Sequence, residues 1–240
     1  MRDRLIVTVG LAGVVAVSWL YLWHDAAMMA SQNETARSMG FVVAFAMWFV
    51  MMIAMMLPSA LPAVLVYAAM VRRQTEQGRA LPAAWIFVTG YLLAWAGFSI
   101  AAVLMQAALE RWELLTPMLD PANHLLSGAL LLAAGIYQWS PAKNACLSKC
   151  RNPVQLFVTR WRAGATGVLR MGLEHGAYCV GCCGMLMLLL FAVGVMNLLW
   201  IAVIAGFVFV EKLLPAGRMT AKFAGGALIV FGLIVLVDAG

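Results

Sequence analysis

Long apolar runs separated by short polar segments dominate this sequence. Most runs approach or exceed the roughly 20 residues that cross about 30 Å of hydrocarbon as an α-helix. We therefore predict an all-α polytopic membrane bundle of about seven transmembrane helices. The predicted spans are residues 5–23, 40–71, 82–109, 122–139, 171–194, 196–210 and 220–237.

Two regions of this pattern predict departures from simple upright helices. The fifth and sixth spans form one continuous apolar run over residues 171–210. As a single helix this run would be about 60 Å long, twice the hydrocarbon thickness, so it must fold back, and Gly194 and Asn197 mark the expected turn. In the second span, Pro58 and Pro62 predict a kinked or broken helix that lies inside the bundle or lines a cavity.

Composition supports a membrane protein. The 240 residues are 65% hydrophobic and 11% charged, whereas ordinary soluble domains are about 45–50% apolar and about 25% charged. We expect one transmembrane domain over residues 1–240. The first span exceeds the roughly 7–15 apolar residues of a secretory signal, so we expect it to be retained. The net charge of +6 lies in short loops, and no nucleic-acid partner is predicted.

Basic residues occur in alternate loops, as the positive-inside rule requires of cytoplasmic segments. This alternation predicts a cytoplasmic N-terminus, an external C-terminus and a cytoplasmic loop over residues 140–170. Arg37 and Arg111 are the two exceptions. The residues assigned to the cytoplasmic side are Arg2, Arg4, Arg72, Arg73, Arg79, Lys143, Lys149, Arg151, Arg160, Arg162, Arg170, Lys212, Arg218 and Lys222.

The fifth span carries the densest group of candidate ligands. His175, Cys179 and either Cys182 or Cys183 recur at i, i+4 and i+7 or i+8, so their side chains share one helical face. Ionisable groups are costly inside a membrane, and Glu174 beside His175 therefore favours a functional site. The alternative is that the cysteines are small packing residues.

A second thiol pair, Cys146 and Cys150, lies in the predicted cytoplasmic loop. The neighbouring Lys143, Lys149 and Arg151 are expected to lower the thiol pKa and favour the metal-binding thiolate. A reduced pair with a structural role fits the spacing equally well, since the cytoplasm disfavours stable disulfides.

The second span also carries a stripe of thioethers on one helical face. Counting 1.5 Å per residue puts its members Met47 and Met51 at the depth of the fifth-span thiols. Thiolates and thioethers together select Cu(I), whereas zinc does not use methionine, so we expect copper and regard zinc as the weaker candidate. Packing is the alternative role for the stripe. Its members are Met47, Met51, Met52, Met55 and Met56.

Glu211 and Lys212 end the sixth span at its cytoplasmic side. An interfacial ion pair is the simplest interpretation of these two residues. Glu211 could also orient His175 or the loop cysteines, a supporting role that we also assign to Glu174 and Lys212.

Together these motifs resemble the predicted metal-binding integral membrane proteins, a former domain of unknown function that includes copper chaperones serving a bacterial tyrosinase. The resemblance implies a protein of the bacterial inner membrane that handles copper for a copper-receiving protein. At Gly184 the family pattern leads us to expect tryptophan. The segments that carry the resemblance are residues 51–58, 139–151, 175–187 and 211–212.

Three functional hypotheses follow from these residues. The first is a binding protein, a copper chaperone, rather than an enzyme. The second is a membrane thiol oxidoreductase that exchanges electrons between its cysteines and a quinone, but the cysteines are predicted to lie on the reducing side of the membrane. The third is an ion transporter that uses Glu174 and the kinked second span, although the chain offers few other polar residues for a pathway.

Overall fold

A computed structural model describes residues 2–31, 40–76, 83–116, 119–162, 164–214 and 217–238. All named elements in these residues are helices, which confirms the predicted all-α class. Arg37 and Arg79 lie outside the described residues. The helices are α1 (Arg2–Ser31), α2 (Phe41–Glu76), α3 (Ala84–Arg111), α4 (His124–Trp139), α5 (Pro141–Arg151), α6 (Pro153–Thr159), α7 (Gly164–Leu188), α8 (Leu190–Val193), α9 (Leu198–Leu213) and α10 (Gly217–Val237).

Five helical segments in the described residues are long and apolar enough to cross a membrane. The predicted fourth and sixth spans are also helical, but α4 and α9 have 16 residues each, about 24 Å of helix. The fifth predicted span begins earlier than expected, at Gly164. The five segments are Leu5–Met28, Phe41–Arg73, Ala84–Arg111, Gly164–Val193 and Gly217–Val237.

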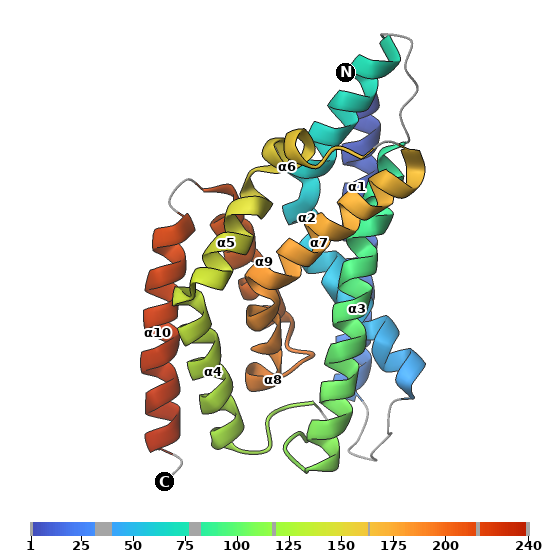
Figure 1. Cartoon of the computed structure of the whole chain (residues 1–240). Coiled ribbons are helices and arrows are strands. Elements are labelled where there is room, and N and C mark those ends of the chain that lie inside the picture. Colours follow the sequence, from blue (N-terminus) through green and yellow to red (C-terminus); the bar gives the residue numbers. More distant parts are fainter. Residues whose placement is uncertain are drawn as a thin grey trace.

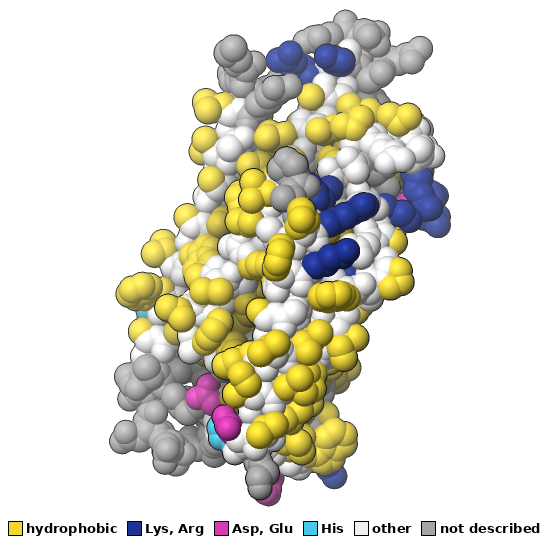
Figure 2. Space-filling model, turned by 90° about the vertical axis from the view of Figure 1, so that its left-hand side faces the viewer, with side chains coloured by type: hydrophobic (Ala, Val, Ile, Leu, Met, Phe, Trp, Pro, Cys, Tyr) yellow, Lys and Arg dark blue, Asp and Glu magenta, His cyan; other side chains and the backbone are white. Residues whose placement is uncertain are grey.

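The long helices alternate in direction along the chain, and α1 begins at the end of the molecule opposite to that at which α10 ends (Figure 1). The small helix α6 lies toward the end where α1 begins, α5 runs from the middle of the molecule toward α6, and α8 lies toward the other end (Figure 1). Apolar side chains cover much of the face seen in Figure 2, as expected of a surface that contacts lipid.

The predicted fold-back between the fifth and sixth spans is confirmed. Gly194 has a φ of 92°, in the left-handed region that glycine enters without steric cost. Asn197 is the N-cap of α9, and its side chain accepts a hydrogen bond from the Trp200 backbone N–H at 3.4 Å. Asparagine is among the preferred N-cap residues because its oxygen satisfies a free backbone donor.

Helix α2 is continuous through Pro58 and Pro62, so the chain does not break there. The Met56 carbonyl near Pro58 accepts hydrogen bonds from Tyr91 Oη at 3.1 Å and from Ser59 Oγ at 2.8 Å. The carbonyls that lose a helical donor are those of Ala54 and Pro58, four residues before each proline. The Tyr91 contact therefore fixes α3 against the proline-containing part of α2. The prediction that this span lies within the bundle is confirmed, because the side chains around Met56 are buried.

Helices α3 and α7 are in close backbone contact because glycines lie at their interface. A Cβ atom added at Gly90 would overlap the Leu169 carbonyl, and one added at Gly172 would overlap the Phe87 carbonyl. Small residues allow this approach between membrane helices. At Gly184, where the family pattern suggested tryptophan, an added Cβ would already touch the Phe98 ring at 3.4 Å.

Candidate metal site

Cys179 lies at the centre of a buried group of side chains from several helices. Its Sγ atom is 2.8 Å from Lys212 Nζ of α9 and 3.1 Å from Tyr91 Oη of α3. Lys212 also donates a hydrogen bond to Ser59 Oγ of α2 at 3.0 Å. The arrangement puts an ammonium group and a hydroxyl in direct contact with a sulfur atom that is 1% exposed.

Two further sulfur pairs flank Cys179. Cys182 Sγ lies 3.9 Å from Cys150 Sγ of α5, and Cys183 Sγ lies 3.6 Å from Met56 Sδ of α2. Metal–thiolate bonds measure about 2.3 Å in zinc sites, so two sulfur atoms that share one ion lie at most about 4.6 Å apart. Both pairs satisfy this limit. Adjacent cysteines of α7 thus contact sulfur atoms on two different helices.

Helix α5 is fixed against this site by a buried ion pair. Lys143 Nζ lies 2.7 Å from Glu211 Oε1, and both side chains are almost fully buried. Lys143 also donates a hydrogen bond to Gln138. The expectation that Glu211 and Lys212 pair with each other is therefore wrong: Glu211 pairs with Lys143, whereas Lys212 contacts Cys179. The Lys143–Glu211 pair orders the helix that carries the loop cysteines.

The loop cysteines lie against α7, and their pKa values shift in the direction opposite to the one expected. Hydrogen bonding to Cys179 and Cys182, together with burial, raises the pKa of Cys150 well above its usual range. Burial and the neighbouring Cys182 raise the pKa of Cys146 more than Lys149 lowers it. The sequence showed the basic neighbours but not the packing of α5 on α7.

His175 lies one helical turn before Cys179 and is 2% exposed. Its ring lies beside those of Phe87 and Tyr91, with centroids 5.8 and 5.9 Å away. The Nδ1 atom of His175 has no hydrogen-bond partner in the described structure. A buried imidazole nitrogen without a partner remains available as a ligand.

Glu174 does not face the thiols. It forms ion pairs with the arginines around the start of α7, at distances between 3.2 and 3.6 Å. The expected association of Glu174 with His175 in a buried pair is therefore wrong, because Glu174 is one residue out of phase with the face of α7 that carries the site. The arginines are Arg160, Arg162 and Arg170.

All five methionines of the predicted stripe are buried in the main apolar core. The contact with a thiol is made by Met56, one or more helical turns further along α2 than the Met47 and Met51 level expected from counting residues. Among the residues that the structure describes, no group of three or more His, Cys, Asp or Glu side chains is arranged to hold a metal ion. The fit of a metal therefore depends on the two sulfur pairs, one of which includes methionine.

The contacts of three residues at the site were not predicted from the sequence. Tyr91 lies in an apolar span, where a mid-membrane hydroxyl that needs a partner was the one available indication. Lys143 was expected to lower the pKa of the loop thiols and not to form a buried ion pair, and Gln138 was given no role. Each became part of the site through helix packing.

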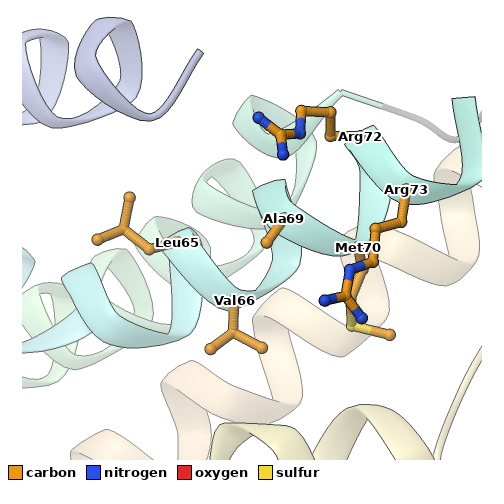
Figure 3. Close-up of a pocket in the computed structure, with 6 residues that line it drawn as sticks. All are labelled: Leu65, Val66, Ala69, Met70, Arg72 and Arg73. Atoms are coloured by element: carbon orange, nitrogen blue, oxygen red, sulfur yellow. The ribbon is translucent and has the colours of Figure 1, made fainter. Parts of the chain in front are cut away.

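A groove on α2 is separate from the sulfur atoms. It has a volume of about 420 Å³ and lies toward the C-terminal end of the helix (Figure 3). None of its lining residues is a predicted ligand, and Met56 lies more than two helical turns before the first of them. The lining residues are Leu65, Val66, Ala69, Met70, Arg72 and Arg73.

Comparison with known proteins agrees with the chemistry of these residues. A family model described as PpoB2, copper chaperone, matches residues 45–235. The matched region includes every predicted ligand. No curated protein and no solved structure matches the chain. Because the family match covers most of the sequence, the chain belongs to the PpoB2 copper chaperone family.

Proposed function

We propose that this protein binds Cu(I) through the sulfur atoms around Cys179 and passes it to a copper-receiving protein. The observation that carries the proposal is the pair of sulfur contacts, Cys182 with Cys150 and Cys183 with Met56, at 3.9 and 3.6 Å. Together they bring soft ligands from three helices to one buried region.

The donor set favours Cu(I) over zinc. Thiolate and thioether ligands together suit a soft monovalent ion, whereas structural zinc sites use four ligands drawn mainly from Cys and His. The described residues offer no close group of three such side chains. We assign the primary ligand roles to Cys150, Cys179, Cys182, Cys183 and Met56, and further roles to His175, Cys146 and the remaining methionines Met47, Met51, Met52 and Met55.

The proposed topology has seven spans, with α4 and α9 as short crossings. The alternating helix directions fit this count (Figure 1). On the face seen in Figure 2, most Lys and Arg side chains lie toward the end where α1 begins, and the acidic side chains lie mainly toward the other end. The positive-inside rule then gives a cytoplasmic N-terminus and an external C-terminus in a bacterial inner membrane, with α5 on the cytoplasmic side.

Metal analysis of purified protein tests the proposal. After growth with copper, wild-type protein is expected to contain about one or more equivalents of copper, because thiolates are the strongest ligands available to it. The triple variant with serine at 179, 182 and 183 is expected to lose this copper. Equal copper in both proteins, at equal yield and helicity, would rule out the assignment.

A matched pair of methionine variants tests the thioether contact. Met56→Leu is expected to lower copper affinity by roughly tenfold, comparable to the loss of supporting groups in other metal sites. Met171→Leu removes a thioether that is as fully buried as that of Met56 but lies in a separate apolar cluster and has no ligand role, so it is expected to change affinity little. Leu and Met have similar volumes, so neither change should cost more than about 1.5 kcal/mol in stability. An equal loss in both variants would argue for packing instead.

A further inference from the structure

Cys150 and Cys182 are positioned to form a bond between α5 and α7. Their Sγ atoms lie 3.9 Å apart, and both cysteines are free thiols. A disulfide requires about 2.05 Å between the sulfur atoms, so the two must approach by only about 2 Å. Cys150 is partly exposed, whereas Cys182 is 1% exposed.

The surroundings favour this pair over the other thiols of the site. Cys146 lies one turn earlier on α5 and faces Gly181, where an added Cβ would lie 2.7 Å from its Sγ atom. Cys179 is also within hydrogen-bonding reach of Cys150, but its Sγ atom is already engaged by Lys212 and Tyr91.

The N-terminal part of α5 is already held by the Lys143–Glu211 ion pair. A bond at Cys150 would fix the C-terminal part of this helix as well. It would also close α5 over the part of α7 that carries the thiols.

We propose that a peroxide joins Cys150 and Cys182 in a reversible disulfide, and that this modification withdraws two sulfur ligands and releases bound copper. The disulfide stands on geometry alone, whereas the release of copper rests on the function proposed above. In the proposed topology the pair lies on the reducing side of the membrane, where disulfides are transient and serve redox sensing.

The reaction balances with hydrogen peroxide as the oxidant. Cys150 attacks the peroxide as the thiolate once it has lost its proton, and the O–O bond breaks. A sulfenic acid forms, and the released hydroxide takes up the proton to give one water. The Cys182 thiol then attacks the Cys150 sulfur, the S–O bond breaks, and a second water leaves. The two thiols lose two electrons to the peroxide, and a cellular thiol can reverse the change by thiol–disulfide exchange.

Peptide mapping of the full-length protein in detergent tests the disulfide. Metal-free wild-type protein treated with hydrogen peroxide, then alkylated and digested, is expected to yield a Cys150–Cys182 cross-linked peptide. Cys146→Ser, the matched control on the same helix, is expected to give the same peptide. Cys150→Ser should give none. A dominant Cys150–Cys179, Cys179–Cys182 or Cys146–Cys182 bond, or no cross-link, would overturn the proposal.

A second measurement follows copper. Peroxide is expected to accelerate the transfer of copper from loaded wild-type protein to a Cu(I) chelator several-fold over the rate without peroxide. In Cys150→Ser, which also lacks a proposed ligand and so has its own basal rate, peroxide is expected to give no such acceleration. Equal acceleration in both proteins alongside a mapped Cys150–Cys182 bond would overturn the regulatory part. Absence of copper from reduced wild-type protein would instead refute the proposed function, and the peptide map would still decide the disulfide.

Discussion

Helices α1 and α7 are equally apolar, yet they occupy opposite environments. The membrane segments Leu5–Met28 of α1 and Gly164–Val193, which contains α7, both have a mean hydropathy of 2.2. In their most apolar 18 residues, however, the protein buries 61% of the α7 segment and only 11% of the α1 segment. Hydropathy therefore identifies both as membrane helices and cannot tell which one is central. The difference lies in the residue types. Helix α7 carries glycines and cysteines that admit close neighbours, whereas α1 presents large exposed side chains such as Leu20 and Trp23.

The buried charges follow the same division. Lys143, Glu211 and Lys212 are all buried close to the thiols of α7. The ion pairs of Glu174, by contrast, involve arginines that are 37–64% exposed. Charges buried within the bundle are costly unless they are paired. Those near the thiols have partners there, because Lys143 pairs with Glu211 and Lys212 contacts Cys179.

The largest expected effect comes from breaking the buried pair. Lys143→Met removes the partner of Glu211 and should lower the free energy of unfolding by about 3–5 kcal/mol, because it leaves a buried carboxylate without its ion-pair partner. Glu174→Gln, at the exposed cluster, should cost about 0–1 kcal/mol. Unfolding followed by circular dichroism in mixed detergent micelles measures both.

A double variant separates charge from packing. Replacing Glu211 by Gln in the Lys143→Met background should recover part of the lost stability, because no unpaired charge is then left. If Lys143→Met and Glu174→Gln cost the same, the buried and exposed pairs are equivalent and the contrast between the two regions is wrong.

Much of the fold was predictable from sequence because it depends on local patterns. Apolar run length placed the helices, and the excess length of residues 171–210 required the fold-back at Gly194. The predicted depth of the methionines in the membrane was less accurate. Counting residues along the spans assumed upright helices and put Met47 and Met51 level with the thiols, whereas the contact with Cys183 is made by Met56. Tilt is set by contacts between helices, which no single segment encodes.

The candidate site was predictable in its residue types and not in its contacts. The cysteines and methionines were identifiable because soft ligands are unusual in such numbers. The partners of Glu174, Glu211 and Lys212 were not, because each depends on which way a side chain points from a helix packed against others. The sequence also gave no measure of burial in α5, so the predicted pKa shift of Cys146 had the wrong sign.

A smaller effect is expected at the contact between α3 and α7. Gly90→Ala would press a methyl group into the Leu169 carbonyl and should cost about 1–3 kcal/mol, the usual cost of overpacking. Gly97, on the same helix, has nothing within 4 Å of an added Cβ, so Gly97→Ala should be neutral or slightly stabilising. Thermal unfolding of the two variants in detergent compares them. A more destabilising change at Gly97 would contradict this helix interface.

The smallest expected effect concerns Cys146, at the boundary between buried site and basic surface. Burial and Cys182 raise the pKa of this thiol, and Lys149 opposes them. Since the thiolate is the reactive form, alkylation of metal-free protein should be slower at pH 7 than that of a free cysteine and should rise as the pH approaches the raised pKa. Lys149→Gln removes the opposing charge, so the rate profile should move to higher pH and the rate at pH 7 should fall by about twofold. Arg151→Gln removes a nearby charge that does not shift this thiol and is the matched control. Faster alkylation in Lys149→Gln, or an equal shift in both variants, would show that the pKa of Cys146 is set by the general charge of the loop instead of by its position against α7.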